Sequence, residues 1–377
     1  MPDSPLMAPS YCGMLITGEI RVTPQQRTVL EAARREFAAD VIFLNSATMG
    51  LPPRRTVEAV QTGLAEWTSG RAEAPAYDVA VSRARSLYAD FVSVDPSLVA
   101  VGGQVSVFAG LIAASLPAGS EVLTAAGDFT SIVFPFHVRA GRGITVREVP
   151  LDRLADAVTK STSLVSVSAV QSADGRVADL DALSSACDAV GARILLDTTQ
   201  AVGWLPVDAS RYAYTVSGGY KWQLIPRGTA FLTIQRDLLD EVAPLNAGWY
   251  AGGERWSSIY GAPLRLATDA RRFDVSPAWL SWIGAVPSLE LLTEVGIDAL
   301  HAHAVGLAHR FCGGVGLPES HSAIVSAVAD ADVPALMRSA NIVGVTRAGR
   351  LRLSFHVSTS EQDVDRAIDV LSGHLRP

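Results

Sequence analysis

The chain is short of cysteine, of charged residues and of long apolar runs, and each shortage excludes a class of protein. Its 377 residues include three cysteines. Cys12, Cys187 and Cys312 are scattered, so they form neither a metal-binding spacing nor a disulfide framework. No apolar run is long enough to span a bilayer, and the first residues lack the cationic start and apolar core of a signal peptide. We therefore expect a cytoplasmic protein with no membrane partner.

The charge and the absence of several known motifs exclude further classes of protein. Charged residues make up 18% of the chain and hydrophobic residues 49%, and the net charge is −7. Such a chain should fold compactly and has no reason to bind nucleic acid. The sequence shows no P-loop and no Ser-His-Asp arrangement. His301 and His303 are two positions apart and do not share a helix face, so we expect no metal site.

From residue 98 onward, apolar segments alternate with helical ones. This alternation is typical of a mainly parallel sheet covered by helices on both faces. The segment at 164–169 is apolar enough to be buried on both sides. The expected fold is α/β, a three-layer sandwich with a mainly parallel seven-stranded sheet. We predict its strands at 98–101, 121–124, 144–149, 164–169, 193–196, 212–216 and 229–234.

The remaining sequence predicts a smaller domain and an arm, and the length alone suggests two domains. The small domain should begin with a long helical stretch from Pro277 to about Phe311, and it should end with a capped helix at 361–374. Its strands are expected at 321–328 and 349–356. We expect an N-terminal arm at 1–22, a large domain at 41–276, and a small α+β domain made from 23–40 and 277–377.

The most informative residues are an aspartate and a lysine at the ends of two successive strands. The run Ile194-Leu-Leu-Asp197 places the aspartate at the end of a buried strand, and Ser217-Gly-Gly-Tyr-Lys221 places the lysine in a turn loosened by glycines. Either residue alone is commonly a turn cap or a surface charge. Pyridoxal phosphate (PLP) enzymes need both, because the lysine bonds to the aldehyde and the carboxylate keeps the pyridine nitrogen protonated. We predict PLP as the cofactor, with Lys221 and Asp197 as catalytic residues.

A glycine pair before a predicted helix supplies a candidate phosphate site. In Val101-Gly-Gly-Gln-Val-Ser106, glycines allow backbone amides to approach an anion, and the helix N-terminus adds positive potential. A glycine pair alone is more often a simple turn. In the same chain as Asp197 and Lys221, it predicts a cradle made by Gly103, Gln104, Val105 and Ser106.

Three further side chains have a functional and an ordinary interpretation. Phe129 follows a strand and would stack on the pyridine ring, or else belong to the core. Gln200 would hydrogen-bond the 3-oxygen of the cofactor or the lysine, or else cap its own turn. Arg352 differs in parity from Leu351 and Leu353, so it points away from their apolar face. There it would grip a carboxylate bidentately or lie in solvent.

Together these motifs resemble fold-type I PLP enzymes of the class V aminotransferase superfamily. That superfamily contains cysteine desulfurases, kynureninases, isopenicillin N epimerase-like proteins and cysteine-conjugate lyases. The resemblance extends from about Phe43 to Ala367. It implies that Lys221 forms the Schiff base, Asp197 pairs with the pyridinium, Gln200 contacts the 3-oxygen, Phe129 stacks and Arg352 binds the substrate carboxylate.

The resemblance also implies roles for residues outside these motifs. Asn45 matches a loop on the substrate side. The segment Arg272-Phe-Asp-Val-Ser276 is similar to one that crosses a dimer interface to reach the neighbouring phosphate, so a homodimer is implied, with Ser276 near the cofactor. Ser217, in the lysine turn, is also among the expected cofactor contacts.

Two departures from the family pattern favour one branch. Tyr220 precedes the lysine, where desulfurases commonly have histidine; a Tyr-Lys pair is more similar to the kynureninase and lyase side, where the phenol helps to hold the phosphate. Desulfurases also need a cysteine in a mobile loop. Cys312 does not occupy that loop and Cys187 is expected in the core, so desulfuration through a persulfide is disfavoured.

The expected reaction is β-elimination from a cysteine S-conjugate, which gives a thiol or sulfenate, pyruvate and ammonia. Similar lyases often serve natural-product pathways, including antibiotic biosynthesis. The aromatic residues Trp249, Tyr250, Trp256 and Tyr260, with Trp279 and Trp282, would either form a pocket for the S-substituent or pack at a domain or dimer boundary. Alternatives are an aminotransferase or epimerase, a decarboxylation-coupled oxidative deaminase, and a catalytically inactive binding protein on the same scaffold.

Overall fold

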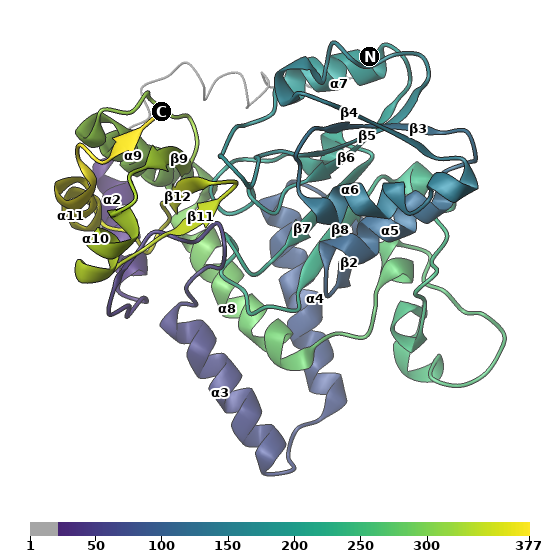
Figure 1. The fold of residues 1–377 in the computed structure, drawn as a ribbon. Helices are drawn as coiled ribbons and strands as arrows, with labels where there is room; N and C mark the ends of the chain where they lie inside the picture. Colours follow the sequence, from purple (N-terminus) through teal and green to yellow (C-terminus); the bar gives the residue numbers. More distant parts are fainter. Residues whose placement is uncertain (1–21) are drawn as a thin grey trace, which may run out of the picture.

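The structure is a computed structural model that describes residues 22–377. Figure 1 shows a larger lobe built around a sheet and a smaller lobe that contains α2, α9, α10 and α11. The helices α3, α4 and α8 extend below the sheet in this view. The arm expected at 1–22 lies outside the described residues, apart from its last residue.

Seven strands form the large sheet, in the order β2-β8-β7-β6-β5-β3-β4. All pairings among β3 to β7 are parallel, whereas β8 runs antiparallel to both β7 and β2. The mainly parallel seven-stranded sheet is therefore confirmed. Its strands are β2 (Val99–Gly102), β3 (Glu121–Ala125), β4 (Thr145–Val149), β5 (Thr162–Ser168), β6 (Arg193–Asp197), β7 (Tyr214–Gly218) and β8 (Ala230–Ile234).

Each face of this sheet has its own apolar core, which makes the lobe three layers thick. On β6, Leu196 packs with residues of α4, α7 and α8, whereas Leu195 packs with residues of α5 and α6. Burial on both faces explains the nearly continuous apolar runs of these strands. The helices of this lobe are α3 (Arg54–Thr68), α4 (Ala74–Phe91), α5 (Val105–Ser115), α6 (Thr130–His137), α7 (Leu180–Asp188) and α8 (Trp279–Val295).

The helical stretch predicted from Pro277 to Phe311 is two helices, which corrects that prediction. α8 ends at Val295 and α9 (Ile297–Val315) begins at once, but the pair is bent by 82°. Gly296 between them has a φ of +82°, which a residue without a Cβ adopts without strain. In the described part of the chain no single helix is long and apolar enough to cross a membrane, and this bent pair passes that test only as two helices together.

The small lobe is α+β, as expected, with more strands than predicted. β9 and β12 pair antiparallel inside a four-stranded sheet ordered β11-β12-β9-β13. The unpredicted strands and helix α10 are too short to give a clear periodicity. The elements are α2 (Pro24–Arg34), β1 (Ile42–Phe43), β9 (Ile324–Ala329), α10 (Val333–Ser339), β10 (Ile342–Val343), β11 (Val345–Arg347), β12 (Arg350–Ser354), α11 (Glu361–Leu371) and β13 (Leu375–Arg376).

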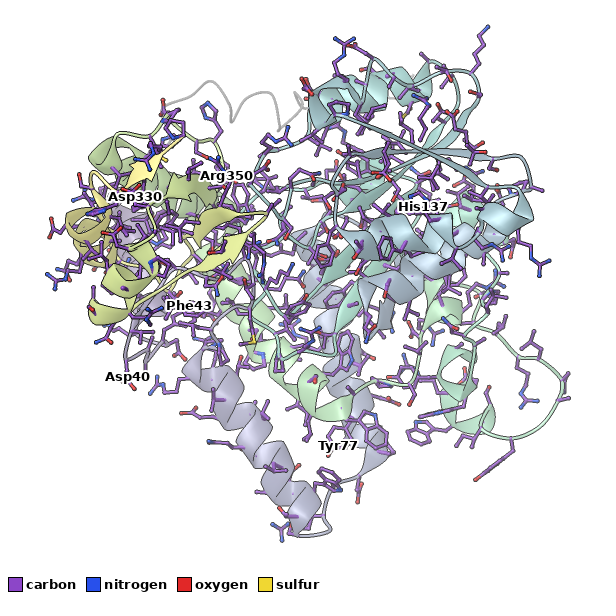
Figure 2. All side chains as sticks on the ribbon, viewed as in Figure 1. Asp40, Phe43, Tyr77, His137, Asp330 and Arg350 are labelled. Atoms are coloured by element: carbon purple, nitrogen blue, oxygen red, sulfur yellow. The ribbon has the colours of Figure 1, made fainter. Side chains whose placement is uncertain are left out.

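A short parallel pair in the small lobe precedes the segment that connects the two lobes. β1 pairs with β10, and Phe43, labelled in Figure 2, is its second residue. The chain then passes between the lobes, where Asn45 bridges to Ser354 and the amide of Gly50 donates to the carbonyl of Tyr220 at 3.0 Å. The turn that holds the predicted lysine is thereby fixed to both lobes. The domain boundaries expected at 41 and 276 stay predictions.

Candidate active site

One pocket collects most of the predicted residues at the carboxyl ends of β5, β6 and β7, where ligands sit in α/β sheets. These strands end at Ser168, Asp197 and Gly218, and each of those three residues lines the pocket. The predicted residues on its wall come from four separate segments: Gly103, Gln104, Val105, Ser106, Phe129, Asp197, Gln200, Tyr220 and Lys221.

Asp197 and Lys221 are buried on this wall and do not form an ion pair with each other. Asp197 is 4% exposed and accepts a hydrogen bond from the amide of Thr199 at 2.8 Å. Lys221 is 5% exposed, and its Nζ has no hydrogen bond or ion pair with a described residue. Burial raises the pKa of Asp197 to about 6, although the Thr199 bonds and the charge of Lys221 oppose it. Burial also lowers the pKa of Lys221 to about 8, so both groups are poised for a ligand.

The N-terminus of α5 opens into the same pocket. Gln104 is its N-cap and makes no side-chain hydrogen bond to the helix. The first-turn amides of a helix have no partner within the helix, and the helix dipole is positive at this end. Gly103, Val105 and Ser106 surround this N-terminus on the pocket wall. The arrangement suits a phosphate group.

Phe129 lies over the lysine and is not a core residue. Its side chain is 44% exposed, and its ring centroid is 5.2 Å from Nζ of Lys221. Asp128 fixes the backbone beneath it, because the carboxylate accepts from the amide of Phe129 at 2.6 Å and from the amide of Ser168 at 2.8 Å. The Asp128 carboxylate therefore ties the loop after β3 to the end of β5. The phenyl ring is held at the pocket mouth as a flat face.

Gln200 lines the pocket, but both ends of its amide already have protein partners. Its Nε2 donates to the carbonyl of Ala47 and to Oγ of Ser172, both at 3.0 Å. Its Oε1 accepts from Nε1 of Trp222 at 2.7 Å. Gln200 thus ties the segment between the lobes to the lysine turn, and its contact with the cofactor 3-oxygen stays a prediction.

The side chain of Arg352 is buried beside the pocket and is not exposed to solvent. Leu351 and Leu353 lie in the small-lobe core, and Arg352 points away from them, 2% exposed. Its guanidinium donates to the carbonyl of Ser172, to Oγ of Ser172 at 3.2 Å and to Oγ1 of Thr48 at 2.7 Å. Burial lowers the pKa of Arg352 to about 10. Because Ser172 lines the pocket, one hydrogen-bonded residue separates this cation from the pocket.

The structure does not bring Asn45, Ser217 or Ser276 to the pocket wall. Oδ1 of Asn45 is buried without a partner among the described residues. Ser217 is fully buried behind the lysine turn, where its hydroxyl accepts from Nε2 of Gln223 at 2.6 Å. Ser276 is exposed. The single chain therefore places none of these three on the pocket wall, and the expected contacts of Asn45 with the substrate and of Ser276 across a dimer stay predictions.

Three aromatic residues of the loop, Trp249, Tyr250 and Trp256, pack together, whereas Tyr260 is exposed. The ring of Trp249 lies 5.2 Å from the rings of both Tyr250 and Trp256. Trp279 stacks on Tyr77, labelled in Figure 2, at 4.9 Å. None of the six aromatic residues of interest lines the pocket. Of the two interpretations of this loop, the structure of the single chain supports packing.

Neither described cysteine is a nucleophile at this site. Cys187 and Cys312 are 1% and 2% exposed and lie in apolar cores. Burial raises the pKa of each thiol to about 11, and neither lines the pocket. Cys12 lies outside the described residues.

Sequence reasoning missed several residues of the wall. Thr199 and Ser131 line the pocket and lie inside the motifs that contain Asp197 and Phe129, so both were within reach of the sequence. Arg227 had no signal, because a single arginine in the turn before a strand is unremarkable. It lines the pocket with its guanidinium carbon 4.8 Å from the ring centroid of Tyr220.

The fold and the site define a PLP-dependent enzyme. The residues fit the cofactor on three counts: an amine without a partner, a buried carboxylate without a cation, and an open helix N-terminus for the phosphate. Comparison with known proteins gives the family. The family model "Aminotransferase class-V" matches residues 42–332, and the chain belongs to that family.

Individual relatives agree with this assignment. The chain is 24% identical to an uncharacterized aminotransferase, YcbU, of Bacillus subtilis (strain 168), over 77% of this chain and 82% of the relative. It is 29% identical to a probable cysteine desulfurase of Aeropyrum pernix, over 71% and 70%. Its fold is similar to the cystine C–S lyase C-DES in complex with cysteine persulfide, with a TM-score of 0.80, 22% identity, and coverage of 89% and 98%.

Proposed function

We propose that this enzyme is a carbon–sulfur lyase that eliminates the β-substituent of a cysteine S-conjugate and releases a thiol or sulfenate, pyruvate and ammonia. The observation that favours it is an open Lys221–Asp197 pair in a pocket whose described wall contains no thiol. A persulfide-forming desulfurase needs such a thiol as acceptor. Among structurally similar proteins, C-DES is itself a cystine C–S lyase with cysteine persulfide as its product.

The proposed chemistry begins with the substrate α-proton. PLP, when bound, supplies an electron sink for the negative charge left at the substrate α-carbon. Lys221 removes that proton as general base, which requires its amine to be neutral. The lowered pKa of Lys221, about 8, makes the neutral form accessible near physiological pH. The C–S bond then breaks, its electron pair leaves with the sulfur, and the sulfur takes up a proton. Water hydrolyses the remaining 2-aminoacrylate to pyruvate and ammonia.

Three other residues position the reactants. Asp197 would keep the pyridine nitrogen of bound PLP protonated. The resulting pyridinium would be the cationic partner that the buried carboxylate lacks in this structure. Phe129 covers one side of the lysine and excludes water from it. Arg352 holds the substrate carboxylate, with Ser172 and Thr48 as the neutral partners that this carboxylate would replace.

The test is a product balance. The holoenzyme is incubated with S-substituted cysteines, and pyruvate, ammonia, alanine and released thiol are measured together. Elimination predicts pyruvate, ammonia and thiol in equal amounts. Alanine with sulfane sulfur would indicate desulfuration, and a keto acid without free ammonia would indicate transamination.

One variant makes this test specific. Cys12→Ser removes the thiol that lies outside the described residues. Under the proposal, the variant forms pyruvate at the same rate as the unaltered enzyme. A loss of sulfur release in Cys12→Ser would contradict the proposal, because it would show that a protein thiol accepts the sulfur.

A further inference from the structure

The pocket contains a second cation that the proposed reaction does not use. Lys221 and Arg227 are the basic residues on its wall, and Lys221 is needed at the aldehyde. Arg227 forms no ion pair with a carboxylate among the described residues, although its side chain is exposed. Its guanidinium lies against the ring of Tyr220, with the carbon 4.8 Å from the ring centroid, within the range of a cation–π contact.

Backbone contacts fix Arg227 beside the helix that forms the anion site. Its carbonyl accepts from Oγ of Ser281 on α8 at 2.8 Å. The next residue, Gly228, lies close to Gly103: its carbonyl oxygen is 3.7 Å from the position that a Cβ would occupy if Gly103 had a side chain. The segment that starts β8 thus touches the segment that starts α5, and Arg227 borders the open helix N-terminus.

A comparison of charges indicates which ligand Arg227 would bind. A phosphate monoester carries a charge of roughly −1.5 to −2 near neutral pH, whereas a helix N-terminus supplies the equivalent of about half a positive charge. The described pocket wall contains no other free cation for this end. A guanidinium presents paired donors that match two phosphate oxygens. The ring of Tyr220 holds that guanidinium in place without neutralising it.

We propose that Arg227, held against the face of Tyr220, binds the phosphate group of PLP and makes the pocket select the phosphorylated form of the cofactor. This inference depends on the cofactor and not on the proposed elimination. Tyr220 is then a positioning residue for Arg227, which it holds through its ring.

The experiment measures cofactor binding to the apoprotein, with PLP and with pyridoxal, which lacks the phosphate. Arg227→Gln should raise the Kd for PLP by about ten- to a hundredfold, the usual effect of losing hydrogen bonds to a charged group. It should change the Kd for pyridoxal by less than about twofold. Arg142→Gln removes an exposed arginine of the same charge that does not line the pocket, and it should leave both values unchanged.

A second pair of variants tests the role of the ring. In Tyr220→Phe the ring remains, so Arg227→Gln should still cost the full factor in PLP affinity. In Tyr220→Leu the ring is absent, so the effect of Arg227→Gln should shrink. An Arg227→Gln variant that binds PLP as tightly as the unaltered protein, or that loses PLP and pyridoxal equally, would overturn the proposal. Thermal unfolding of each apoprotein checks that the fold is intact.

Discussion

Two buried acid–base pairs in this molecule have opposite designs. Asp274 and Arg85 form a closed ion pair: two guanidinium nitrogens donate to the two carboxylate oxygens at 3.1 and 2.6 Å, and the amide of Val101 donates at 2.8 Å. Asp197 and Lys221 are just as buried, but they form no ion pair with each other. Each charged group lines the pocket and remains free to bind a ligand.

The closed pair has a structural role, whereas the open pair has a functional one. Arg85 lies on α4 and Asp274 follows the 3₁₀ turn at Ala270–Phe273, so the closed pair clamps β2 immediately before the predicted phosphate cradle. It has no capacity left for a ligand. The open pair leaves two charges unsatisfied, which costs stability until a molecule with a complementary cation and electrophile is bound. Four predictions test this contrast.

Lys221→Ala should have the largest effect, because it removes both the covalent link to the cofactor and the general base. Turnover should fall by at least about 10³- to 10⁴-fold. Lys160 and Lys221 are the only lysines in the chain, and Lys160 is exposed outside the pocket. Borohydride reduction of the holoenzyme followed by peptide mass analysis should label Lys221 alone. Label on Lys160, or full activity in Lys221→Ala, would show the lysine assignment to be wrong.

Breaking the closed pair should be the next largest effect, and it should act on stability. Asp274→Ala leaves the guanidinium of Arg85 buried without its carboxylate, which typically costs about 3–5 kcal/mol. The measurement is urea unfolding of the apoprotein. Joint replacement in Arg85→Met/Asp274→Leu should recover much of the loss, because the guanidinium of Arg85 is then absent and Arg255, 3.9 Å from Asp274, keeps Asp78 as a carboxylate partner. A single variant as stable as the unaltered protein would contradict the structural role.

Neutralising the open pair should do the reverse and stabilise the apoprotein. The pKa of Asp197 is raised from 3.8 to about 6, so ionisation is penalised in the folded state. This penalty is absent below the unfolded value, grows between pH 3.8 and about 6, and is fully present above it. Asp197→Asn should therefore raise the unfolding free energy above pH 6 by up to about 3 kcal/mol, at roughly 1.4 kcal/mol per pKa unit.

The measurement for Asp197→Asn is unfolding at pH 4 and at pH 8, with turnover as a second readout. The gain should be small at pH 4 and large at pH 8, and activity should be lost. Equal stability changes at the two pH values would mean that the carboxylate is already satisfied in the apoprotein.

Arg352 provides the smallest effect and an intermediate case, a buried cation with only neutral partners. Arg352→Ala should raise KM for the amino-acid substrate by about ten- to a hundredfold, the range for losing a charged hydrogen-bonded pair. The value of kcat should change much less. Steady-state kinetics with Arg352→Lys as the conservative control separates charge from fork geometry. An unchanged KM would remove Arg352 from the substrate site.

The sequence was a good guide wherever one segment determined its own structure. The strand that ends at Asp197 and the turn that contains Lys221 were readable because apolar runs and glycines have local meanings. For Arg352 the sequence predicted only part of the structure. Its position in the alternating strand predicted the correct face of the strand. Its burial was not predictable, because its partners Ser172 and Thr48 lie 180 and 304 residues away in sequence. The bend at Gly296 was missed because both sides of it are strongly helical.

What the sequence determined by itself was the class of fold, the cofactor and most of the residues that line the pocket, because alternation, glycine spacing and strand-end polar groups follow from local rules. Only the tertiary structure decided which charges are paired. Whether a buried carboxylate meets a guanidinium, as Asp274 does, or faces an open pocket, as Asp197 does, depends on chain segments far apart in sequence. The position of Arg227 near the start of α5 was decided in the same way, by the hydrogen bond from Ser281 on α8 and by the close approach of Gly228 to Gly103.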